Sequence, residues 1–441
     1  MVLAKLIDLT VRDGQQSLLA TRMSTEDILE IVELLDKAGF YALEVWGGAT
    51  FDAPLRFLNE DPWERLKAIR EVVKRTKLMM LLRGMNLVGY WHYPKDVVNA
   101  FIEYAHKDGI DIFRVFDALN DLSNLEFPVK KVKEVGAEVQ VCMVYTTSPV
   151  HTTEYYVKLA EEILSRFEPD AITIKDMSGI LKPYVAYELV KEIKRLGAKV
   201  NVHSHATAGL APLTLLKSIE AGADYVDVTL SSLSLYTSHT PAESLIEALR
   251  GTPYDTGVNV EPLYEASRRL WVIRRKYRRF DYALKEPPVD VRVLKHQIPG
   301  GMLSNLLAQL KEVHAEDKLE EVLEEVVRVR EDLGWPPLVT PVSQIVGTQA
   351  VLNVIAGRYK AVIDELIEYV RGKYGKPPAP ISKDLIKLIE KRLSERRESK
   401  KVARVTLEDA KKELPSECVE KFEDYITYAL FPNVAKDFLC G

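Results

Sequence analysis

The stretch KVNVHSHATAG, residues 199–209, carries the clearest indications of both fold and site in this chain. Its first half is a short apolar run typical of a β-strand, and the residues after it follow a helical pattern through Ile219. His203 and His205 are two positions apart, so their side chains leave the same face of a strand. Imidazoles are common metal ligands, and this pair would lie where a strand passes into a βα loop.

An isolated pair of histidines at this spacing would often only fill a polar position at a strand end. Two other predicted strands, however, also end in residues that can bind metal: residues 172–177 (ITIKDM) and residues 9–14 (LTVRDG). The carboxyl ends of parallel strands lie at one edge of a sheet or barrel. We therefore expect these side chains to meet at a common site.

Strand-like apolar runs alternate with amphipathic helical patterns over about 250 residues. The predicted strands are 6–11, 42–46, 78–82, 112–116, 139–145, 171–174, 200–203 and 225–230. The predicted helices include 25–38, 62–75, 94–106, 154–167, 183–196 and 210–221. Repeated βα units of this kind predict an α/β fold, a (β/α)8 TIM barrel with its active site at the carboxyl ends of the strands.

A doubly wound sheet is the competing architecture, but no GxGxxG sequence follows the first strand and no P-loop is present. The stretch Thr240–Glu243 (TPAE) is typical of a capping box that starts a helix. After about residue 285 the pattern becomes helical, with a proline-rich break at 377–380. We expect a TIM-barrel domain, 1–285, and a mainly helical C-terminal region, 286–441, that contributes to the active-site mouth.

Composition excludes several classes of protein. The net charge of −5 does not indicate a positively charged surface for binding nucleic acid. No apolar run reaches the ~20 residues needed to span a membrane. The first residues lead directly into a strand and lack the pattern of a signal peptide. The three cysteines, Cys142, Cys418 and Cys440, are scattered and odd in number, so we expect neither a disulfide framework nor a zinc-binding CxxC pair. A reducing cytoplasm is the predicted location.

Six motifs resemble the carboxyltransferase subunits of biotin-dependent enzymes, and they occur in the order found in that family. They are Arg12–Arg22 (RDGQQSLLATR), Leu81–Asn86 (LLRGMN), Lys175–Met177 (KDM), His203–His205 (HSH), His296–Met302 (HQIPGGM) and Thr340–Gly347 (TPVSQIVG). The family includes the oxaloacetate decarboxylase alpha subunit, the B subunit of pyruvate carboxylase and the transcarboxylase 5S subunit. The resemblance extends over nearly the whole chain and implies a TIM barrel followed by a helical region.

The resemblance implies a divalent metal bound by a set of four side chains. The set is Asp13, Lys175, His203 and His205, with the lysine carried as its carbamate. The carbamate is sensible because a protonated lysine would repel a cation, whereas the CO2 adduct is an anionic oxygen donor. Two nitrogen and two oxygen ligands suit zinc, with manganese or cobalt as alternatives. Unmodified, Lys175 would instead form a salt bridge with Asp176 or Asp13.

The same resemblance implies that the bound metal stabilises a pyruvate enolate during carboxyl transfer between carboxybiotin and pyruvate or oxaloacetate. Arg12, Gln16 and Arg83 match substrate-binding positions, and a guanidinium can hold a carboxylate through two hydrogen bonds. Arg12 and Asp13 are neighbours and would diverge in a regular strand. Both can serve the site only if the backbone turns there, as Gly14 would permit.

Thr340 matches the family's proton shuttle between the substrate methyl group and the ureido nitrogen of biotin. A hydroxyl suits that role because it can donate and accept in one step without carrying charge. From the sequence alone Thr340 would be a helix N-cap before Pro341. The predicted biotin pocket combines Thr340 with Arg83, Tyr90 and, more weakly, Ser343.

Some positions depart from the family pattern. Ala206 follows the second metal histidine, where relatives often carry a polar residue, and Gln15 and Gln344 differ from common choices near the biotin pocket. His151 and His239 also fall in βα loops, but no spacing supports them, so we interpret them as hydrogen-bonding loop residues.

No Met-Lys-Met biotinylation sequence occurs in this chain, so biotin is expected to arrive in trans on a biotin carboxyl carrier protein. The alternative is a biotinyl domain that follows in a longer protein, because the stretch Phe431–Val434 resembles the end of the family's core domain. Biotin carboxylase or decarboxylase subunits are further expected partners, and a homodimer is the expected assembly. Two other functions stay open: a transcarboxylase 5S-like subunit, and a metal-dependent aldol-type enzyme such as hydroxymethylglutaryl-CoA lyase or isopropylmalate synthase. A subunit that serves assembly without catalysis is a third alternative, opposed by the retention of every predicted metal ligand.

Overall fold

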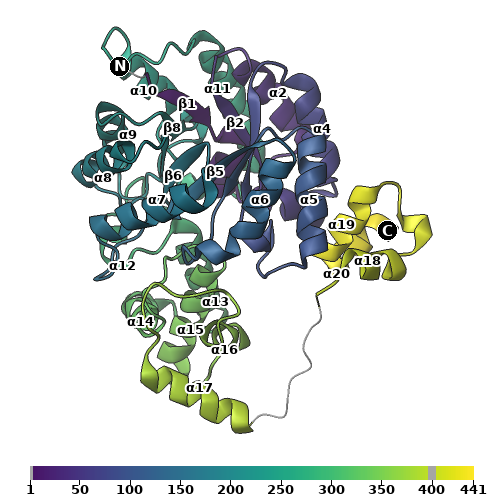
Figure 1. Ribbon diagram of the computed structural model, residues 1–441, viewed down its shortest axis with the longest axis vertical. Coiled ribbons are helices and arrows are strands. Elements are labelled where there is room, and N and C mark those ends of the chain that lie inside the picture. Colours follow the sequence, from purple (N-terminus) through teal and green to yellow (C-terminus); the bar gives the residue numbers. More distant parts are fainter. Residues whose placement is uncertain (1–2, 396–403) are drawn as a thin grey trace.

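The computed structural model describes residues 3–395 and 404–441, and its centre is a closed barrel of parallel strands (Figure 1). The strands are β1 (Lys5–Asp8), β2 (Ala42–Gly47), β3 (Lys77–Leu82), β4 (Ile112–Val115), β5 (Glu138–Val144), β6 (Ala171–Asp176), β7 (Val200–Ser204) and β8 (Tyr225–Val228). They pair in chain order, and β8 pairs with β1 from Lys5–Tyr225 to Asp8–Val228 to close the barrel. The predicted TIM barrel and its eight strands are therefore confirmed.

Helices surround the barrel and cover the apolar outer faces of its strands. They are α1 (Gln15–Leu19), α2 (Thr25–Leu35), α3 (Ala49–Ala53), α4 (Pro62–Val72), α5 (Lys95–Lys107), α6 (Glu126–Glu134), α7 (Thr153–Phe167), α8 (Pro183–Arg195), α9 (Ala211–Glu220), α10 (Ala242–Leu249) and α11 (Glu261–Arg274). Side-chain N-caps stabilise the first turns of some of these helices. The Ser24 hydroxyl accepts from the Asp27 amide at α2, and the Thr152 hydroxyl accepts from the Tyr155 amide at α7. The residues along the strands are almost all buried, as expected for a sheet packed on both faces.

The capping box predicted at Thr240–Glu243 is wrong. Helix α10 begins at Ala242 after Pro241, and no side chain caps its first turn. The Glu243 carboxylate instead accepts hydrogen bonds from the amide and hydroxyl of Ser231, each at 2.8 Å. Glu243 therefore binds the loop after β8 instead of capping its own helix.

The chain beyond the barrel forms two helical groups. The first consists of α12 (Val293–His296), α13 (Gly300–Glu312), α14 (Leu319–Asp332), α15 (Val342–Ala356), α16 (Asp364–Val370) and α17 (Lys383–Glu395). Its apolar core includes Leu81, Phe116 and Val144 from the ends of barrel strands, so this group lies over the barrel mouth. In Figure 1 it lies below the barrel.

The second group, α18 (Leu407–Glu413), α19 (Phe422–Leu430) and α20 (Pro432–Cys440), packs on the outside of the barrel beside α4 and α5 (Figure 1). The Trp63 indole donates to the Thr427 hydroxyl at 2.9 Å, and the Tyr104 and Phe422 rings stack at 4.8 Å. The helical character predicted for the C-terminal region is confirmed. A division of the chain at residue 285 stays a prediction.

The cysteine prediction is wrong for one pair. Cys418 and Cys440 form a disulfide, because the packing of α20 against the preceding turn brings their Cα atoms to 4.9 Å. Their sequence separation of 22 residues has no characteristic spacing, so the sequence alone did not indicate the bond. Cys142 on β5 is free and buried.

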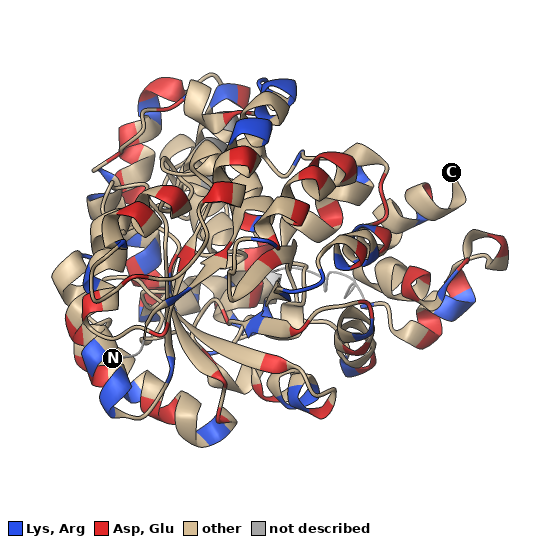
Figure 2. Cartoon of the chain, turned by 90° about the horizontal axis from the view of Figure 1, so that it is seen from above, with Lys and Arg blue, Asp and Glu red and all other residues tan. Residues whose placement is uncertain are grey.

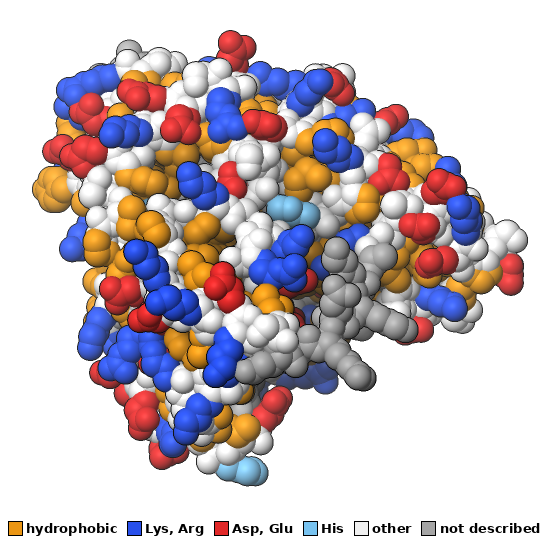
Figure 3. Space-filling model, turned by 60° about the horizontal axis from the view of Figure 1, so that its bottom comes forward, with side chains coloured by type: hydrophobic (Ala, Val, Ile, Leu, Met, Phe, Trp, Pro, Cys, Tyr) orange, Lys and Arg blue, Asp and Glu red, His pale blue; other side chains and the backbone are white. Residues whose placement is uncertain are grey.

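The surface carries both charges in close mixture. Acidic and basic residues alternate along the helices around the barrel (Figure 2), and the face drawn in Figure 3 mixes both with hydrophobic side chains. Of the helices described, none combines a bilayer-spanning length with an apolar composition.

Candidate active site

The first part of the site is the turn that follows β1. The strand stops at Asp8, whose carboxylate accepts from the amide and hydroxyl of Thr10 at 3.0 and 2.8 Å. Residues Thr10–Gly14 then form a π-helical turn, which points Arg12 and Asp13 inward and places Arg12 Nη2 2.8 Å from Asp13 Oδ2. The backbone turn that the two side chains required is confirmed.

Glycine in this turn allows close packing and is not required by the backbone conformation. The φ of Gly14 is −58°, a value open to any residue. A Cβ atom there would lie 3.2 Å from the Thr229 methyl group and 3.4 Å from the Leu233 carbonyl oxygen. The turn therefore packs directly against the loop that follows β8.

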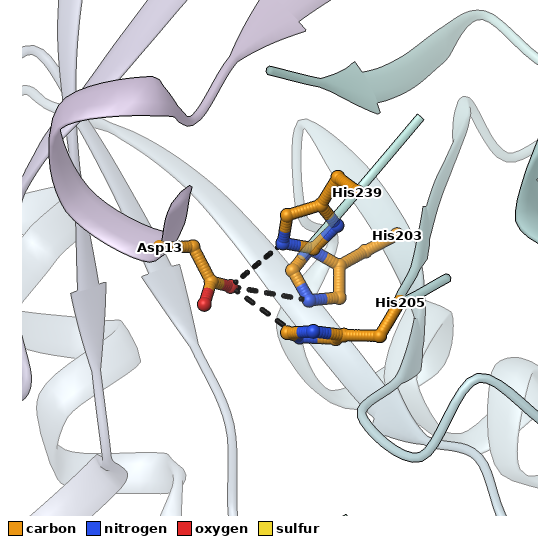
Figure 4. A group of neighbouring side chains, drawn as sticks. All are labelled: Asp13, His203, His205 and His239. Carbon is orange, nitrogen blue, oxygen red and sulfur yellow. Dashed lines mark ion pairs between the residues drawn. The ribbon is translucent and has the colours of Figure 1, made fainter. Parts of the chain in front are cut away.

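The end of β7 delivers the two histidines of the HSH motif. His203 Nε2 lies 3.5 Å from Asp13 Oδ2, and His205 Nε2 lies 3.6 Å from the same oxygen (Figure 4). Both rings are buried. The carboxylate of Asp227 accepts from His203 Nδ1 at 2.7 Å, and the Thr237 carbonyl accepts from His205 Nδ1 at 2.6 Å. Each ring therefore turns an unprotonated Nε2 toward Asp13, as a metal ligand would.

His239, on the loop between β8 and α10, joins this group, and the interpretation of it as a hydrogen-bonding loop residue is incomplete. Its Nδ1 does donate to the Ser204 carbonyl at 3.1 Å, but its Nε2 lies 3.1 Å from Asp13 Oδ2 (Figure 4). No motif spacing indicated His239, and its position after β8 was the one available signal. The corresponding interpretation of His151 is confirmed by its 2.7 Å hydrogen bond with the Ser148 hydroxyl.

Asp13, His203, His205 and His239 form a cluster that fits a divalent cation. One ligand atom from each lies within 4.8 Å of all the others. His205 Nε2 and His239 Nε2 are buried and have no hydrogen-bond partner among the described residues. Buried polar atoms without partners are costly, and a bound cation would satisfy both.

Lys175 lies beside this cluster on β6 and is fully buried. Its Nζ is 3.3 Å from His203 Nε2, and within the described chain no carboxylate forms a salt bridge with it. The alternative of a salt bridge to Asp176 or Asp13 is therefore wrong. Asp176 instead accepts from the Ile180 and Leu181 amides and the Ser204 hydroxyl.

Burial and neighbouring charge set the protonation of the cluster. Burial lowers the pKa of Lys175, and the positive charge of Arg12 lowers it further. The lowered pKa favours the neutral amine, which is the form that can take up CO2. Burial holds the pKa of His203 well below its ordinary value, and the charge of Lys175 lowers it further. For Asp13 burial acts in the opposite sense, but Arg12 and two neighbouring imidazoles outweigh it and hold its pKa well below the usual range. A carboxylate with neutral imidazoles is the protonation state that a metal requires.

A chain of buried ion pairs supports the cluster from inside the barrel. Arg12 pairs with Glu44 on β2, and Glu44 Oε2 lies 3.0 Å from Arg114 Nη1 on β4. Arg114 in turn binds both carboxylate oxygens of Asp227, at 2.5 and 3.0 Å, and Asp227 holds His203. Each charge has a partner of opposite sign, which buried charges need. Glu44, Arg114 and Asp227 were not predicted from the sequence, because single charged residues within apolar strands have no distinctive spacing.

A cavity of about 560 Å³ opens over the cluster between the barrel and the helical group at its mouth. Asp13, Gln16 and His205 line it from the barrel side, and Thr340 and Ser343 line it from the side of α15. Thr340 also lines a smaller adjacent pocket that contains Arg83. The interpretation of Thr340 as a helix N-cap is wrong, because α15 begins at Val342 after Pro341 without a side-chain cap.

The other predicted residues lie close to these spaces. Arg83 Nη1 donates to the carbonyls of Val88 and Gly89 at 2.9 and 3.0 Å, and its guanidinium lies 5.5 Å from the centre of the Tyr90 ring. The free edge of Arg83 and the unpartnered Oε1 of Gln16 flank the same space beside Gly48. Arg12 is the exception: it is fully buried between acidic partners and is not among the residues that line the cavity.

This architecture defines a TIM-barrel protein with a histidine–aspartate cluster at the carboxyl ends of its strands and a helical group over the mouth. Two known families match separate parts of the chain. A family described as HMGL-like matches residues 4–270, and a family described as a conserved carboxylase domain matches residues 293–440.

Individual similar proteins indicate more closely which kind of enzyme this chain resembles. The B subunit of pyruvate carboxylase from Methanocaldococcus jannaschii is 54% identical over 446 residues, which cover 100% of this chain and 78% of that protein. The 2-oxoglutarate carboxylase large subunit of Hydrogenobacter thermophilus is 47% identical, over 98% of this chain and 67% of that protein. The carboxyl transferase domain of Rhizobium etli pyruvate carboxylase, solved with pyruvate and biocytin, superposes with a TM-score of 0.91 at 33% identity, over 99% of this chain and 77% of that one.

The chain belongs to the carboxyltransferase family of biotin-dependent enzymes, which includes the B subunit of pyruvate carboxylase. The resemblance read from the six motifs is thereby confirmed.

Proposed function

We propose that this protein is a carboxyltransferase subunit that moves a carboxyl group between carboxybiotin and pyruvate, forming or consuming oxaloacetate. One observation carries the proposal. Thr340 borders both the cavity over the histidine–aspartate cluster and the pocket that holds Arg83. Thr340 therefore lies at the boundary of two adjoining spaces, which is where a group that passes a proton between two substrates would have to lie.

Asp13, Lys175, His203 and His205 are the proposed ligands of a divalent metal, with zinc preferred and manganese or cobalt as alternatives. The unpartnered His205 Nε2, the low pKa of Asp13 and the lack of a salt bridge at Lys175 within the described chain support this set. A carbamate on Lys175 would add a negative oxygen donor to it. A metal bound there supplies Lewis-acid stabilisation of charge on the keto oxygen of the substrate.

The polar groups that face the cavity favour a small 2-oxoacid with one carboxylate. Arg83 and Gln16 flank the same space, so they can together hold that carboxylate, while Arg12 would lie behind Asp13 near the keto oxygen. Among the described residues that line the larger cavity there is no lysine or arginine. A second carboxylate, as in 2-oxoglutarate, would therefore lack a cationic partner, and pyruvate fits better.

In the carboxylation direction the transferred carboxyl group leaves the ureido nitrogen of biotin and bonds to the methyl carbon of pyruvate. The methyl group loses one proton and the ureido nitrogen gains one. Thr340 accepts the first proton and donates its own, which leaves the hydroxyl unchanged after each turnover. The biotin ring would lie against Tyr90 and Arg83, with Ser343 as a further polar contact.

The biotin itself would come from a carrier domain or a biotin carboxyl carrier protein, loaded by a biotin carboxylase. Decarboxylase subunits are an alternative partner for the same half-reaction run in reverse. A cytoplasmic location and a homodimer stay predictions made from the sequence.

The test is oxaloacetate decarboxylation by the purified protein with measured metal content. Free biotin should stimulate pyruvate formation in metal-replete protein and not in metal-stripped protein, and oxalosuccinate, the carboxylated form of 2-oxoglutarate, should be a poor substrate. Bound metal without biotin-stimulated turnover would contradict carboxyl transfer and favour the aldol-type alternative.

A further inference from the structure

We infer that His239 is a direct ligand of the divalent metal, so that three imidazoles and Asp13 form the core of the centre. The inference rests on the proposed metal site but not on the identity of the reaction. It adds to the four-residue set that the family resemblance implies a side chain from a different loop, the one between β8 and α10.

The hydrogen-bond partners determine which nitrogen of each ring is free. A carbonyl oxygen can only accept, so the 3.1 Å contact from His239 Nδ1 to the Ser204 carbonyl requires the proton on Nδ1. His205 is fixed in the same way by the Thr237 carbonyl at 2.6 Å. With the proton on Nδ1, the neutral form of each ring carries a lone pair on Nε2.

These lone pairs face another acceptor at short range. His239 Nε2 lies 3.1 Å from Asp13 Oδ2, in a fully buried site, and within the described chain no hydrogen-bond partner satisfies it. Two acceptors at this distance repel each other unless a proton or a metal cation lies between them, and a metal cation can serve several such contacts at once. Figure 4 shows all three rings directed at the Asp13 carboxylate, so one cation would serve every contact.

The distances agree with ligands around one small ion. Metal–ligand bonds of about 2.0–2.1 Å at tetrahedral angles separate neighbouring ligand atoms by about 3.4 Å. The distances from Asp13 Oδ2 to the three Nε2 atoms are 3.1, 3.5 and 3.6 Å. All three lie within about 0.3 Å of that separation, so the distance of His239 is compatible with an inner-sphere position, as are those of His203 and His205.

His151 provides a matched control. It is also a buried histidine on a βα loop with an unpartnered Nε2, but it packs against Tyr155 and Tyr156 and lies outside the metal cluster. Each of the substitutions His239→Phe and His151→Phe removes both ring nitrogens of its histidine and keeps an aromatic ring. Thermal melting of the metal-free proteins shows whether each variant folds, and His239→Asn, which keeps an oxygen donor, is a second variant.

The experiment measures the affinity of the full chain for Zn2+ and the visible absorption of its Co2+ form. His239→Phe should weaken Zn2+ binding by about 100-fold or more and change the Co2+ spectrum, because loss of an outer-shell partner alone typically costs about 10- to 100-fold. His151→Phe should change neither, and His239→Asn should bind more tightly than His239→Phe.

An unchanged Co2+ spectrum in folded His239→Phe would overturn the inference and leave the proposed function standing. A wild-type protein that binds no divalent metal would overturn both. The two failures are therefore distinguishable.

Discussion

The two walls of the cavity differ in charge and in the elements that support them. The barrel wall presents Asp13 and His205, held by strands and by a chain of buried ion pairs. The wall formed by the helical group presents Thr340, Ser343 and Gln344 among apolar residues, and no lining residue described on that side carries a charge. One wall carries a carboxylate and an imidazole, and the other carries neutral hydrogen-bonding groups.

Under the proposed function, this difference would assign the steps of the reaction to different parts of the chain. Stabilising negative charge requires fixed charges in a dry site, and the barrel provides them on short strand ends. Moving a proton between two bound molecules requires a group near both, and the proposed group is Thr340, which lies just before α15 and borders both spaces. Substitutions on the two walls should therefore impair different properties of the protein: metal binding on the barrel wall and proton transfer on the helical wall.

The largest effect is expected for Asp13→Ala on the barrel wall. Loss of the carboxylate leaves the imidazoles without an anionic partner, so bound metal should be lost and turnover should fall by about 1,000-fold or more. Metal analysis and oxaloacetate decarboxylation measure both quantities. Asp8→Asn is the control, because Asp8 is buried at the end of β1, close in sequence, but binds Thr10.

A slightly smaller effect, of a different kind, is expected for Thr340→Ala on the helical wall. Biotin-stimulated turnover should fall by about 100- to 10,000-fold, the usual range for losing a proton-transfer group, while metal content stays at the wild-type level. Thr348→Ala, on the same wall, should remain active, and Thr340→Ser should recover part of the rate. Normal turnover of Thr340→Ala would remove the proposed division between the walls.

Asp227→Asn tests the ion-pair chain behind the barrel wall. Asp227 orients His203 through a 2.7 Å hydrogen bond and neutralises Arg114. Metal affinity should fall by about 10- to 100-fold, since outer-shell partners have effects of that size. Titration with a chelator measures it, and wild-type affinity would mean that His203 is oriented by other contacts.

The smallest effect is expected at Tyr90, in the proposed biotin pocket. Tyr90→Ala removes the ring beside the Arg83 guanidinium, so the KM for free biotin should rise by roughly fivefold, corresponding to about 1 kcal/mol, with little change in kcat. Tyr90→Phe keeps the ring and should resemble wild type. A large loss of kcat in either variant would place Tyr90 in the chemistry rather than in biotin binding.

The barrel was predictable from sequence because strand and helix periodicities are local and repeated around it. All the predicted strands overlap observed ones, although the first ends at Asp8 instead of continuing to Val11. The turn at Thr10–Gly14 ends that strand, and the sequence indicated it only through the need to bring Arg12 and Asp13 to one site.

Features that depend on distant contacts were not predictable. His239 meets Asp13 because the β1 and β8 loops are adjacent in the closed barrel, and no local pattern around either residue reveals that neighbourhood. The disulfide between Cys418 and Cys440 has the same origin in helix packing. The substrate and biotin residues stay predictions, and the position of Gln16, Arg83, Thr340 and Ser343 at the cavity or the adjoining pocket supports four of them.

The most direct test of the division between the walls is to measure metal content and biotin-stimulated oxaloacetate decarboxylation in the same samples of wild type, Asp13→Ala and Thr340→Ala. The account predicts metal and turnover in wild type, neither in Asp13→Ala, and full metal without biotin-stimulated turnover in Thr340→Ala. Wild-type turnover in metal-free Asp13→Ala, or in Thr340→Ala, would contradict it.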